Sequence, residues 1–315
     1  MRSSTNSSLL IGSLGVVVVH YGSRESTVRC VASILNDPSP VHREVVVVDN
    51  SNNLDSALGV QILPCPDNPG FGEGANRGIR ALAAKGLRDF VVLNHDVELL
   101  PGFLHAAVLG LQLDQVAAVG GPLFLSDRRT LWSAGGFLLW PLGVVIQHSS
   151  YRWVWRAREV GFLPGAALAL RGSAFASVGG FDPRFFLYHE DLDLCLRLRR
   201  AGWRLWFSPK AAAVHHVGMA TGSHRHSSSY LEHLTRTRLL AFRPLAFRLW
   251  LALVHSGYAL VRAGGLALAS RREEALAILR GHWAAVKNIR SGPLPVRVKR
   301  RRLDGEGQQK PGSLA

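Results

Sequence analysis

Two acidic side chains stand where apolar runs of the chain end. Asp49 closes the run EVVVVDN, and Asp96 lies in NHDVE directly after the run DFVVLN. Carboxylate oxygens at such positions suit Mg²⁺ or Mn²⁺, which proteins hold with one or two carboxylates together with substrate phosphates. An aspartate in a solvated turn has the same sequence pattern. The residue types alone therefore leave a metal ligand and a turn residue as open alternatives.

A second acidic pair, Glu190 and Asp191, lies near the start of a predicted helix over residues 188–201. Acids in the first turn and arginines in the last turn complement the helix dipole, which is one reason for their presence. The preceding segment, GGFDPRFFLYH, is unusually apolar for a lead into two charges. This apolar flank predicts a partly desolvated cleft, in which a carboxylate can act as a general base.

Neighbouring histidines and a group of glycines complete the candidate residues. His215 and His216 follow another apolar run, and histidine serves both as a metal ligand and as a structural residue. Segment 67–79 contains a formal dinucleotide fingerprint, but three prolines lie just before it, where that fingerprint requires a central strand. We expect its glycines to allow a close backbone approach to a ligand or to form a turn: Gly70, Gly72, Gly74 and Gly78.

Alternating strands and helices must position these residues. Strands are predicted over residues 15–21, 44–50 and 89–97, with helices over 24–36 and 73–87 between them. This alternation predicts an α/β fold with a mostly parallel central sheet and helices on both faces. Ligands bind at the carboxyl ends of the strands in such sheets, where the candidate acids stand. The chain from about 116 to 180 has shorter apolar runs and predicts a mixed, less regular sheet.

The composition sets the class of protein. With 315 residues, of which 47% are hydrophobic, the chain can bury a large core, which excludes a disordered chain and a miniature scaffold. The three cysteines lie far apart with no CxxC pair, which argues against a zinc site or a disulfide framework. We therefore expect a reducing, cytoplasmic location. The apolar run after the polar N-terminal residues is rich in valine and predicts a strand rather than a signal peptide.

The net charge of +15 requires an anionic partner: nucleic acid, anionic lipid or a phosphorylated substrate. Residues 231–315 carry +11 and residues 1–230 carry only +4. A non-enzymatic protein that binds membranes or nucleic acid through the basic C-terminal part is therefore an alternative to an enzyme. Such a protein would lose affinity steeply with salt and would have no activity on nucleotide-sugars.

A long apolar stretch lies within the basic C-terminal part. Only 13 uncharged residues separate Arg248 from Arg262, fewer than the roughly 20 that a transmembrane helix needs. Arg248, His255 and Arg262 are spaced by seven and form a polar stripe opposite a broad apolar face, as in an interfacial helix. The basic run RVKRRR near the C-terminus can attract anionic lipid headgroups. A helix that packs on the main domain is the alternative.

Taken together, these segments resemble the family 2 inverting glycosyltransferases of GT-A fold, in particular the rhamnosyltransferase-like branch. The matching segments occur in the family's order across residues 16–221. They are VVVVHYGS, VVVVDNSNN, NPGFGEGANRGI, VVLNHDVEL, LPGAALALRGSAF, VGGFDPRFFLYHEDLDLCLRLRRAGWRLWFSP and AVHHVGMAT.

The resemblance implies a site for a nucleotide-sugar donor. Asp49 would accept a hydrogen bond from the pyrimidine N3–H beside Tyr21. Residues 68–78 would form a loop that closes over the nucleoside, with Asn76 as a polar contact. Asn94 occupies the place of the first acid of the family's DxD motif. The implied donor-binding residues are Tyr21, Asp49, Asn68, Gly70, Phe71, Gly72, Asn76, Asn94 and Asp96.

The resemblance also implies roles in catalysis. Asp96 and His215 would hold Mg²⁺ or Mn²⁺, with His216 as the alternative to His215. Asp191, in HED, matches the family's catalytic base. Gly165 and Glu190 would lie on the sugar or acceptor side. Donors in this branch are often dTDP-rhamnose, and acceptors are glycans or polyprenyl-linked sugars of cell-wall or surface-polysaccharide synthesis. No nucleic acid partner is implied.

These considerations predict four parts of the chain. A flexible N-terminal tail comprises residues 1–11, and a GT-A domain comprises residues 12–230. An amphipathic, membrane-associating helical segment comprises residues 231–295, and a basic disordered tail comprises residues 296–315. We therefore expect a peripheral protein on the cytoplasmic face of the plasma membrane.

Overall fold

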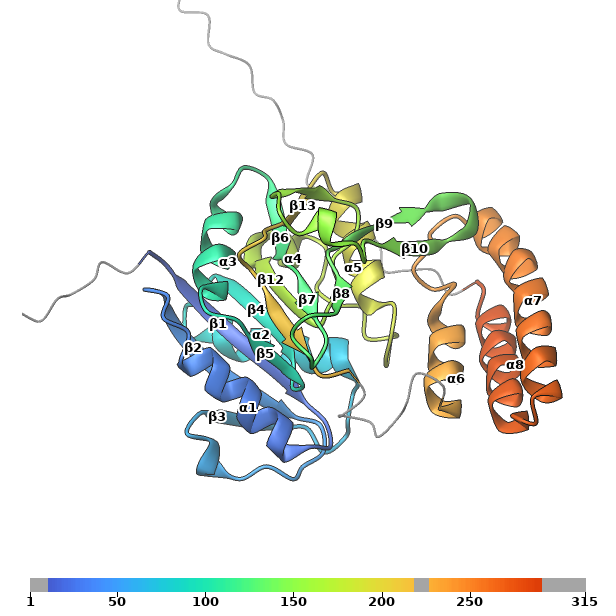
Figure 1. The fold of residues 1–315 in the computed structure, drawn as a ribbon, viewed down its shortest axis with the longest axis horizontal. Helices are drawn as coiled ribbons and strands as arrows, with labels where there is room; N and C mark the ends of the chain where they lie inside the picture. Colours follow the sequence, from blue (N-terminus) through green and yellow to red (C-terminus); the bar gives the residue numbers. More distant parts are fainter. Residues whose placement is uncertain (1–10, 218–226, 291–315) are drawn as a thin grey trace, which may run out of the picture.

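The computed structural model describes residues 11–217 and 227–290 and shows a mixed α/β domain with a helical extension (Figure 1). The central sheet has eight strands in the order β11-β13-β6-β12-β4-β1-β2-β3. All of them run in one direction except β11 and β12, so the predicted mostly parallel sheet is confirmed. These strands are β1 (Ser13–His20), β2 (His42–Asp49), β3 (Gln61–Pro64), β4 (Asp89–Asn94), β6 (Val116–Gly120), β11 (Arg158–Val160), β12 (Ala167–Arg171) and β13 (Arg204–Phe207).

The unbroken valine runs occur because both faces of the sheet are covered. On β1, Val16 and Val18 enter the hydrophobic core on one face, and Val17 and Val19 enter the core on the other. Side chains of a strand alternate between faces, so a strand with two covered faces needs apolar residues throughout. The first core receives α1 (Arg24–Leu35) and α3 (Phe103–Gln112), and the second receives α2 (Phe71–Ala84), α4 (Gly172–Ser177) and α5 (Glu190–Arg200).

The strand register brings the predicted polar residues to one edge of the sheet. His20, the last residue of β1, lies opposite Asp49, the last residue of β2. Asn94 ends β4 opposite Val19, so all three strands end together. The antiparallel strand β12 begins at this same edge, because its first residue, Ala167, pairs with Leu93. Residues that precede β12 therefore join those that follow β1, β2 and β4.

A second, smaller sheet extends this edge, as expected for the less regular part of the chain. Its order is β5-β14-β7-β8, and His215, the last residue of β14, lies opposite Val97 at the start of β5. This pairing brings residues 215 and 96 together although 118 residues lie between them. The remaining short elements are β5 (Val97–Leu99), β7 (Leu123–Phe124), β8 (Leu131–Ser133), β9 (Gly136–Leu139), β10 (Val144–Gln147), β14 (Ala213–His215) and the 3₁₀ turns Ser56–Leu58, Trp140–Leu142 and Tyr151–Trp153.

Helix α5 is anchored inside the domain by a buried ion pair. Arg197 and Asp193 have fully buried side chains, and Nε of Arg197 donates to Oδ2 of Asp193 at 2.7 Å. The same guanidinium donates to the carbonyl oxygens of Val178 and Gly180 at 2.8 and 2.7 Å. Paired and hydrogen-bonded in this way, a buried charge does not destabilise the fold as an unpaired one would.

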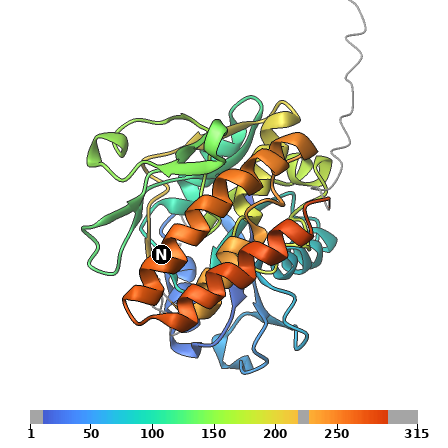
Figure 2. The same ribbon diagram turned by 90° about the vertical axis from the view of Figure 1, so that its right-hand side faces the viewer.

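The C-terminal helices α6 (Ser228–Thr237), α7 (Leu245–Leu268) and α8 (Arg272–Lys287) lie together on one side of the molecule (Figures 1 and 2). A Cβ atom at Gly281 of α8 would lie 2.0 Å from Oγ1 of Thr235 on α6, so these helices cross at close range. The predicted boundary between residues 230 and 231 falls inside α6. The predicted tails lie outside the described residues, apart from residue 11.

The orientation of α7 differs from that of an interfacial helix whose polar stripe faces water. Arg248 and His255 are only 4% and 5% exposed, and Arg262 is partly exposed. The hairpin β9–β10 reaches over α7, where Nε1 of Trp250 donates to the carbonyl oxygen of Pro141 at 2.9 Å (Figure 1). Within the polar stripe His255 has inward hydrogen-bond partners, Arg238 and the carbonyl oxygen of Leu142, which heptad spacing alone does not reveal.

Candidate functional site

Asp96 and His215 meet at the edge of the sheet, as predicted. Asp96 lies in the turn between β4 and β5 and is 5% exposed; His215 is 7% exposed. Nε2 of His215 lies 3.2 Å from Oδ1 of Asp96 and 3.4 Å from Nδ2 of Asn94. The turn after β4 and the end of β14 thus place a carboxylate, an imidazole and an amide around one point.

The neighbouring His216 lies in a different environment. Its Nδ1 lies 3.0 Å from the hydroxyl of Ser126, and its Nε2 lies 2.9 Å from Oε1 of Glu98. Both ring nitrogens of His216 are therefore engaged by protein side chains. The sequence left the two histidines as alternatives, and only His215 faces Asp96.

The pair of Asp96 and His215 fits a divalent cation. Nδ1 of His215 is buried without a hydrogen-bond partner, and Oδ1 of Asp96 is buried with Nε2 of His215 at 3.2 Å as its neighbour. Burial by itself raises the pKa of the Asp96 carboxyl, but His215 and then His95 outweigh burial and hold this pKa below its usual range, so the group is anionic. Residues 11–217 and 227–290 contain no group of three or more His, Cys, Asp or Glu side chains arranged to hold a metal ion by themselves. A cation here would need further ligands, as substrate phosphates provide.

Two rings line this point in addition to the predicted residues. The ring of His95 lies edge-on to that of His20 at 5.3 Å, and burial lowers the pKa of His95 to about 4, so this ring is neutral at pH 7. The ring of Trp132, on β8, lies edge-on to His215 at 4.9 Å. Sequence reasoning missed Trp132 because only the pairing of the small sheet brings β8 to this edge.

Asp191 lies at the N-terminal end of α5, with its carboxylate held by backbone groups. Its Oδ2 accepts a hydrogen bond from the N–H of Gly165 at 2.9 Å, and its Oδ1 accepts from the N–H of Leu192 at 2.7 Å. A Cβ atom at Gly165 would lie 3.1 Å from Cβ of Asp191 and 3.5 Å from the ring of Phe71. Gly165, Phe71 and Asp191 therefore meet at one place, and a side chain at position 165 would crowd the carboxylate.

Burial changes the acidity of the pair that begins α5. It raises the pKa of Glu190, which is 7% exposed, and the charge of Asp191 raises it further. Burial also raises the pKa of Asp191, against the hydrogen bonds from Gly165 and Leu192. Oε2 of Glu190 has no hydrogen-bond partner. A carboxylate with a raised pKa is a stronger base, which suits Asp191 to accepting a proton.

The residues just before this pair adopt an unusual backbone conformation. Tyr188 and His189 both have φ of 67°, in the left-handed region that non-glycine residues rarely occupy. The ring of Tyr188 contacts that of Tyr230 at 5.0 Å, and Nδ1 of His189 lies 3.0 Å from the hydroxyl of Thr237. Helix α6 therefore supports the segment that positions Asp191, and nothing in the sequence pattern signalled this contact.

Asp49 and Tyr21 lie together at the carboxyl ends of β2 and β1. Asp49 is 2% exposed, and Tyr21 is 47% exposed. The Asp49 carboxylate accepts hydrogen bonds from the N–H groups of Ser51, Asn53 and Leu54 at 3.0, 3.0 and 2.9 Å, which holds the loop after β2. A carboxylate has about four acceptor positions, so one remains. Its contact with a nucleobase stays a prediction.

The predicted closing loop at residues 68–78 is a helix from Phe71 onward. Asn76, on this helix, is 7% exposed; its Nδ2 donates to Glu73 and to the carbonyl oxygen of Phe181, both at 2.9 Å. Its Oδ1 accepts from the N–H of Phe181 at 3.0 Å. The polar atoms of Asn76 are thus engaged within the protein, and a contact of this side chain with the nucleoside stays a prediction.

The glycines around the start of α2 allow close approaches to other parts of the protein. Gly70 has φ of +86°, and a Cβ atom there would lie 2.1 Å from the carbonyl oxygen of Phe186. The neighbouring Phe71 N–H donates to this oxygen at 3.1 Å. Oδ1 of Asn68 accepts from the N–H of Gly70 at 3.4 Å. Gly72 and Gly78 let α2 approach Phe181 and Val17.

Comparison with known proteins identifies relatives over most of the chain. A family model described as Glycosyltransferase like family 2 matches residues 12–239. The chain is 30% identical to N-acetylglucosaminyl-diphospho-decaprenol L-rhamnosyltransferase of Mycobacterium tuberculosis in an alignment of 256 residues, which covers 69% of this chain and 83% of that protein. It is 38% identical to a rhamnosyltransferase of Escherichia coli K12 in an alignment of 166 residues. This alignment covers 51% of this chain and 50% of that protein.

Solved structures show the same fold at low sequence identity. GalNAc-T7, solved with UDP, GalNAc and Mn²⁺, has a TM-score of 0.53 and 16% identity, covering 72% of this chain and 48% of that one. A mannosyltransferase from Pyrobaculum calidifontis, solved with GDP-Man and Mn²⁺, has a TM-score of 0.51 and 15% identity, covering 88% and 86% of the two chains. These similarities confirm the expected GT-A fold class.

Proposed function

Because the chain belongs to glycosyltransferase family 2, we propose that it transfers rhamnose from dTDP-rhamnose to a hydroxyl group of a polyprenyl-linked sugar. The family match covers residues 12–239 and establishes a nucleotide-sugar-dependent glycosyltransferase. The alternative of a non-enzymatic binding protein is therefore wrong. Similarity to rhamnosyltransferases supports the choice of sugar and is consistent with a reaction in cell-wall or surface-polysaccharide synthesis.

The observation that carries this proposal is the closeness of a metal-binding pair and a candidate base. Asn94 N–H donates to the carbonyl oxygen of Ala166 at 2.9 Å, and the next residue back, Gly165, binds the Asp191 carboxylate. Asp96 is two residues beyond Asn94. Asp96 after β4, and Asp191 held beside the residues that precede β12, therefore lie at the same edge of the sheet.

The reaction assigns one task to each group. A divalent cation held by Asp96 and His215 would supply positive charge that stabilises the departing nucleoside diphosphate. Asp191 removes the proton of the acceptor hydroxyl as this oxygen forms a bond to the anomeric carbon. The bond from that carbon to the phosphate oxygen breaks, and its electron pair leaves with the diphosphate. A single displacement of this kind inverts the configuration at the anomeric carbon.

The acceptor is inferred from the relatives. The Mycobacterium tuberculosis protein is named for transfer of L-rhamnose to a sugar carried on diphospho-decaprenol. We propose an acceptor of the same chemical class for this chain: a sugar linked through diphosphate to a polyprenyl chain. Such an acceptor lies at a membrane surface, whereas the donor is soluble in the cytoplasm.

A transfer assay tests the proposal. The full chain is incubated with dTDP-rhamnose and a polyprenyl-diphosphate sugar, with Mn²⁺, with Mg²⁺ or with a chelator, and the product is analysed by mass spectrometry and by NMR of the new linkage. We expect metal-dependent transfer with inversion. Transfer from UDP- or GDP-sugars, but not from dTDP-rhamnose, would overturn the choice of donor, and retention of configuration would overturn the mechanism.

The two histidines provide a matched control for the metal site. Titration of dTDP with and without Mn²⁺ measures donor affinity in His215→Ala, Asp96→Asn and His216→Ala. We expect the first two variants to lose the gain in affinity that Mn²⁺ brings, and His216→Ala to keep most of it, because His216 faces Glu98 instead of Asp96. Equal loss in both histidine variants would contradict the assignment of His215.

A further inference from the structure

One side of α7 is apolar and exposed along the whole helix. We call it the outer face of α7; its large side chains are between 49% and 90% exposed. No charged or hydrogen-bonding side chain other than the indole of Trp250 lies on it, since Arg248 and Arg262 point elsewhere. The outer face consists of Ala246, Leu249, Trp250, Leu253, Gly257, Leu260, Val261, Gly264, Ala267 and Leu268.

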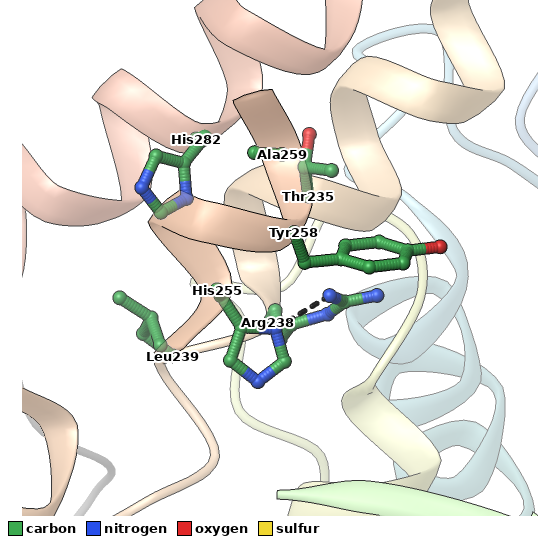
Figure 3. A pocket seen from close by; sticks show the side chains of 7 residues that line it. All are labelled: Thr235, Arg238, Leu239, His255, Tyr258, Ala259 and His282. Carbon is green, nitrogen blue, oxygen red and sulfur yellow. Dashed lines mark hydrogen bonds between the residues drawn. The ribbon is translucent and has the colours of Figure 1, made fainter. Parts of the chain in front are cut away.

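The inner side of α7 is fixed to the protein by hydrogen bonds. Figure 3 shows Nη1 of Arg238 directed at Nδ1 of His255, at 2.6 Å. A guanidinium only donates, so Nδ1 accepts, and the hydrogen on Nε2 of His255 is donated to the carbonyl oxygen of Leu142 at 2.8 Å. A cavity of about 10 Å³, enough for one water molecule, lies beside them. Rotation of α7 would break these bonds, so the outer face remains outside.

Helix α8 extends the exposed surface and adds positive charge. Figure 2 shows α7 and α8 side by side on one side of the molecule. Leu276, Trp283 and Val286 of α8 are 49%, 64% and 38% exposed, and Nζ of Lys287 lies 5.0 Å from the ring of Trp283. Exposed cations accompany them, and the chain continues beyond residue 290 with the basic run RVKRRR. The cations are Arg272, Arg280, Lys287 and Arg290, of which Arg280 pairs with the exposed Glu273 at 3.8 Å.

We infer that the outer face of α7 and the exposed side of α8 form one docking surface for an anionic lipid membrane, with α7 lying along it. Apolar side chains flanked by cations and a tryptophan are typical of helices that lie in a membrane interface. The partner must be anionic as well as apolar, because a second copy of this chain would bring like charges together. By length and composition alone α7 could cross a membrane, but its inner side is bound to Arg238 and Leu142.

Docking on this surface brings the sheet edge that carries Asp96, His215 and Asp191 to the acceptor. We call this edge the reaction edge. Helix α6 packs on α8 and also holds the segment before Asp191, through the contacts of Tyr230 with Tyr188 and of Thr237 with His189. The docking surface and the candidate base are thus joined by one helix. This inference rests on the proposed function, since a polyprenyl-linked sugar is the substrate that a membrane presents.

Flotation with vesicles tests the docking surface in the absence of any substrate. The full chain is mixed with vesicles of phosphatidylglycerol or of phosphatidylcholine. We compare the natural sequence with the double variant Leu253→Glu/Val261→Glu and with Leu109→Glu on α3. Leu253 and Val261 are 70% and 77% exposed and Leu109 is 49% exposed, so none of these changes disturbs the core.

We expect binding to phosphatidylglycerol vesicles, weaker binding to phosphatidylcholine, and at least about a tenfold loss for the double variant, because two apolar contacts with the lipid are replaced by charges. Leu109→Glu should bind as the natural sequence does. Unchanged binding of the double variant would overturn the inference. A second result would also overturn it: the natural sequence does not bind vesicles but forms a dimer in light scattering, and the double variant does not form this dimer.

A soluble acceptor separates this inference from the proposed function. With a sugar diphosphate that carries a short, water-soluble chain, the double variant should transfer rhamnose at the rate of the natural sequence. With the acceptor in phosphatidylglycerol vesicles it should be slower in proportion to its lost binding. Loss of transfer with both acceptors would assign the outer face to the catalytic fold and overturn its role in docking.

Discussion

The reaction edge and the helical extension are incomplete in opposite chemical senses. At the edge, buried polar atoms such as Nδ1 of His215 and Oε2 of Glu190 have no hydrogen-bond partner. On the outer face of α7, apolar side chains such as Leu253 and Val261 have no packing partner. Unpaired polar atoms and exposed apolar side chains both cost free energy, so each region is completed by another molecule. The first requires a polar, charged ligand, and the second requires an apolar surface.

The largest expected effect separates these two regions by activity. Asp191→Asn removes the proton acceptor without changing the size of the side chain, so we expect kcat to fall by about 10²- to 10⁴-fold while dTDP binding stays within twofold or so. Steady-state kinetics and calorimetric titration measure the two quantities. The docking-surface variant Leu253→Glu/Val261→Glu should show neither loss with a soluble acceptor. Substantial turnover by Asp191→Asn would remove Asp191 from the reaction.

A smaller effect separates the regions by stability. His255→Leu leaves the partly buried guanidinium of Arg238 without this acceptor, and we expect a loss of about 1–3 kcal/mol of unfolding free energy. The double variant His255→Leu/Arg238→Met removes both polar groups and should recover part of this loss. Urea unfolding of the two single variants and the double variant measures the coupling. Strictly additive losses would contradict a hydrogen bond between these side chains.

The smallest expected effect is a response to acid. Burial lowers the pKa of His189 to about 3, and burial together with Arg238 lowers the pKa of His255 and His282. The ordinary pKa of histidine is 6.5. As the pH falls below this value, these side chains take up protons in the unfolded chain before they do so in the folded protein. Their contribution to the free energy of unfolding is therefore complete above pH 6.5 and is lost as the pH falls. Each histidine whose folded form stays neutral can cost up to about 1.4 kcal/mol per pH unit.

Hydrogen exchange measures this response region by region. Between pH 6.5 and pH 5 we expect α6 to α8 to lose protection before β1, β2 and β4 do, because the core between these helices is small and comprises Leu231, Ala259, Ala277 and Ile278. Equal loss of protection in the central strands would show that the helical extension and the sheet unfold as one unit.

The sequence allowed much of the reaction edge to be predicted. Valine runs identified the strands, and the residues at their ends, including Asp49 and Asp96, lie where parallel strands must end together. Asp191 begins a helix with acids first and arginines last, as its composition indicated. These features depend on residues close together in the chain, and local periodicity encodes them directly.

Other features depend on contacts between distant segments and could not be predicted. Asn76 binds Phe181, 105 residues away, and so lies in a helix that packs on the domain rather than in a loop over a ligand. Trp132 reaches His215 only through the small sheet. For α7, the heptad spacing defined a polar and an apolar side, but the side that faces the protein depends on Arg238 and Leu142.

The buried Arg197 also determines where the carboxylate of Asp191, the candidate base, points. Its guanidinium is bonded to Asp193 and to two backbone carbonyl groups, so turning α5 about its axis by even one residue would leave a charge unpaired in the interior. Asp191 stands on the same rigid helix, two residues before Asp193. The orientation of the Asp191 carboxylate is therefore fixed by an interior residue that does not contact the substrate. Random substitution of residue 197 would therefore misdirect the reaction before it altered any contact with donor or acceptor.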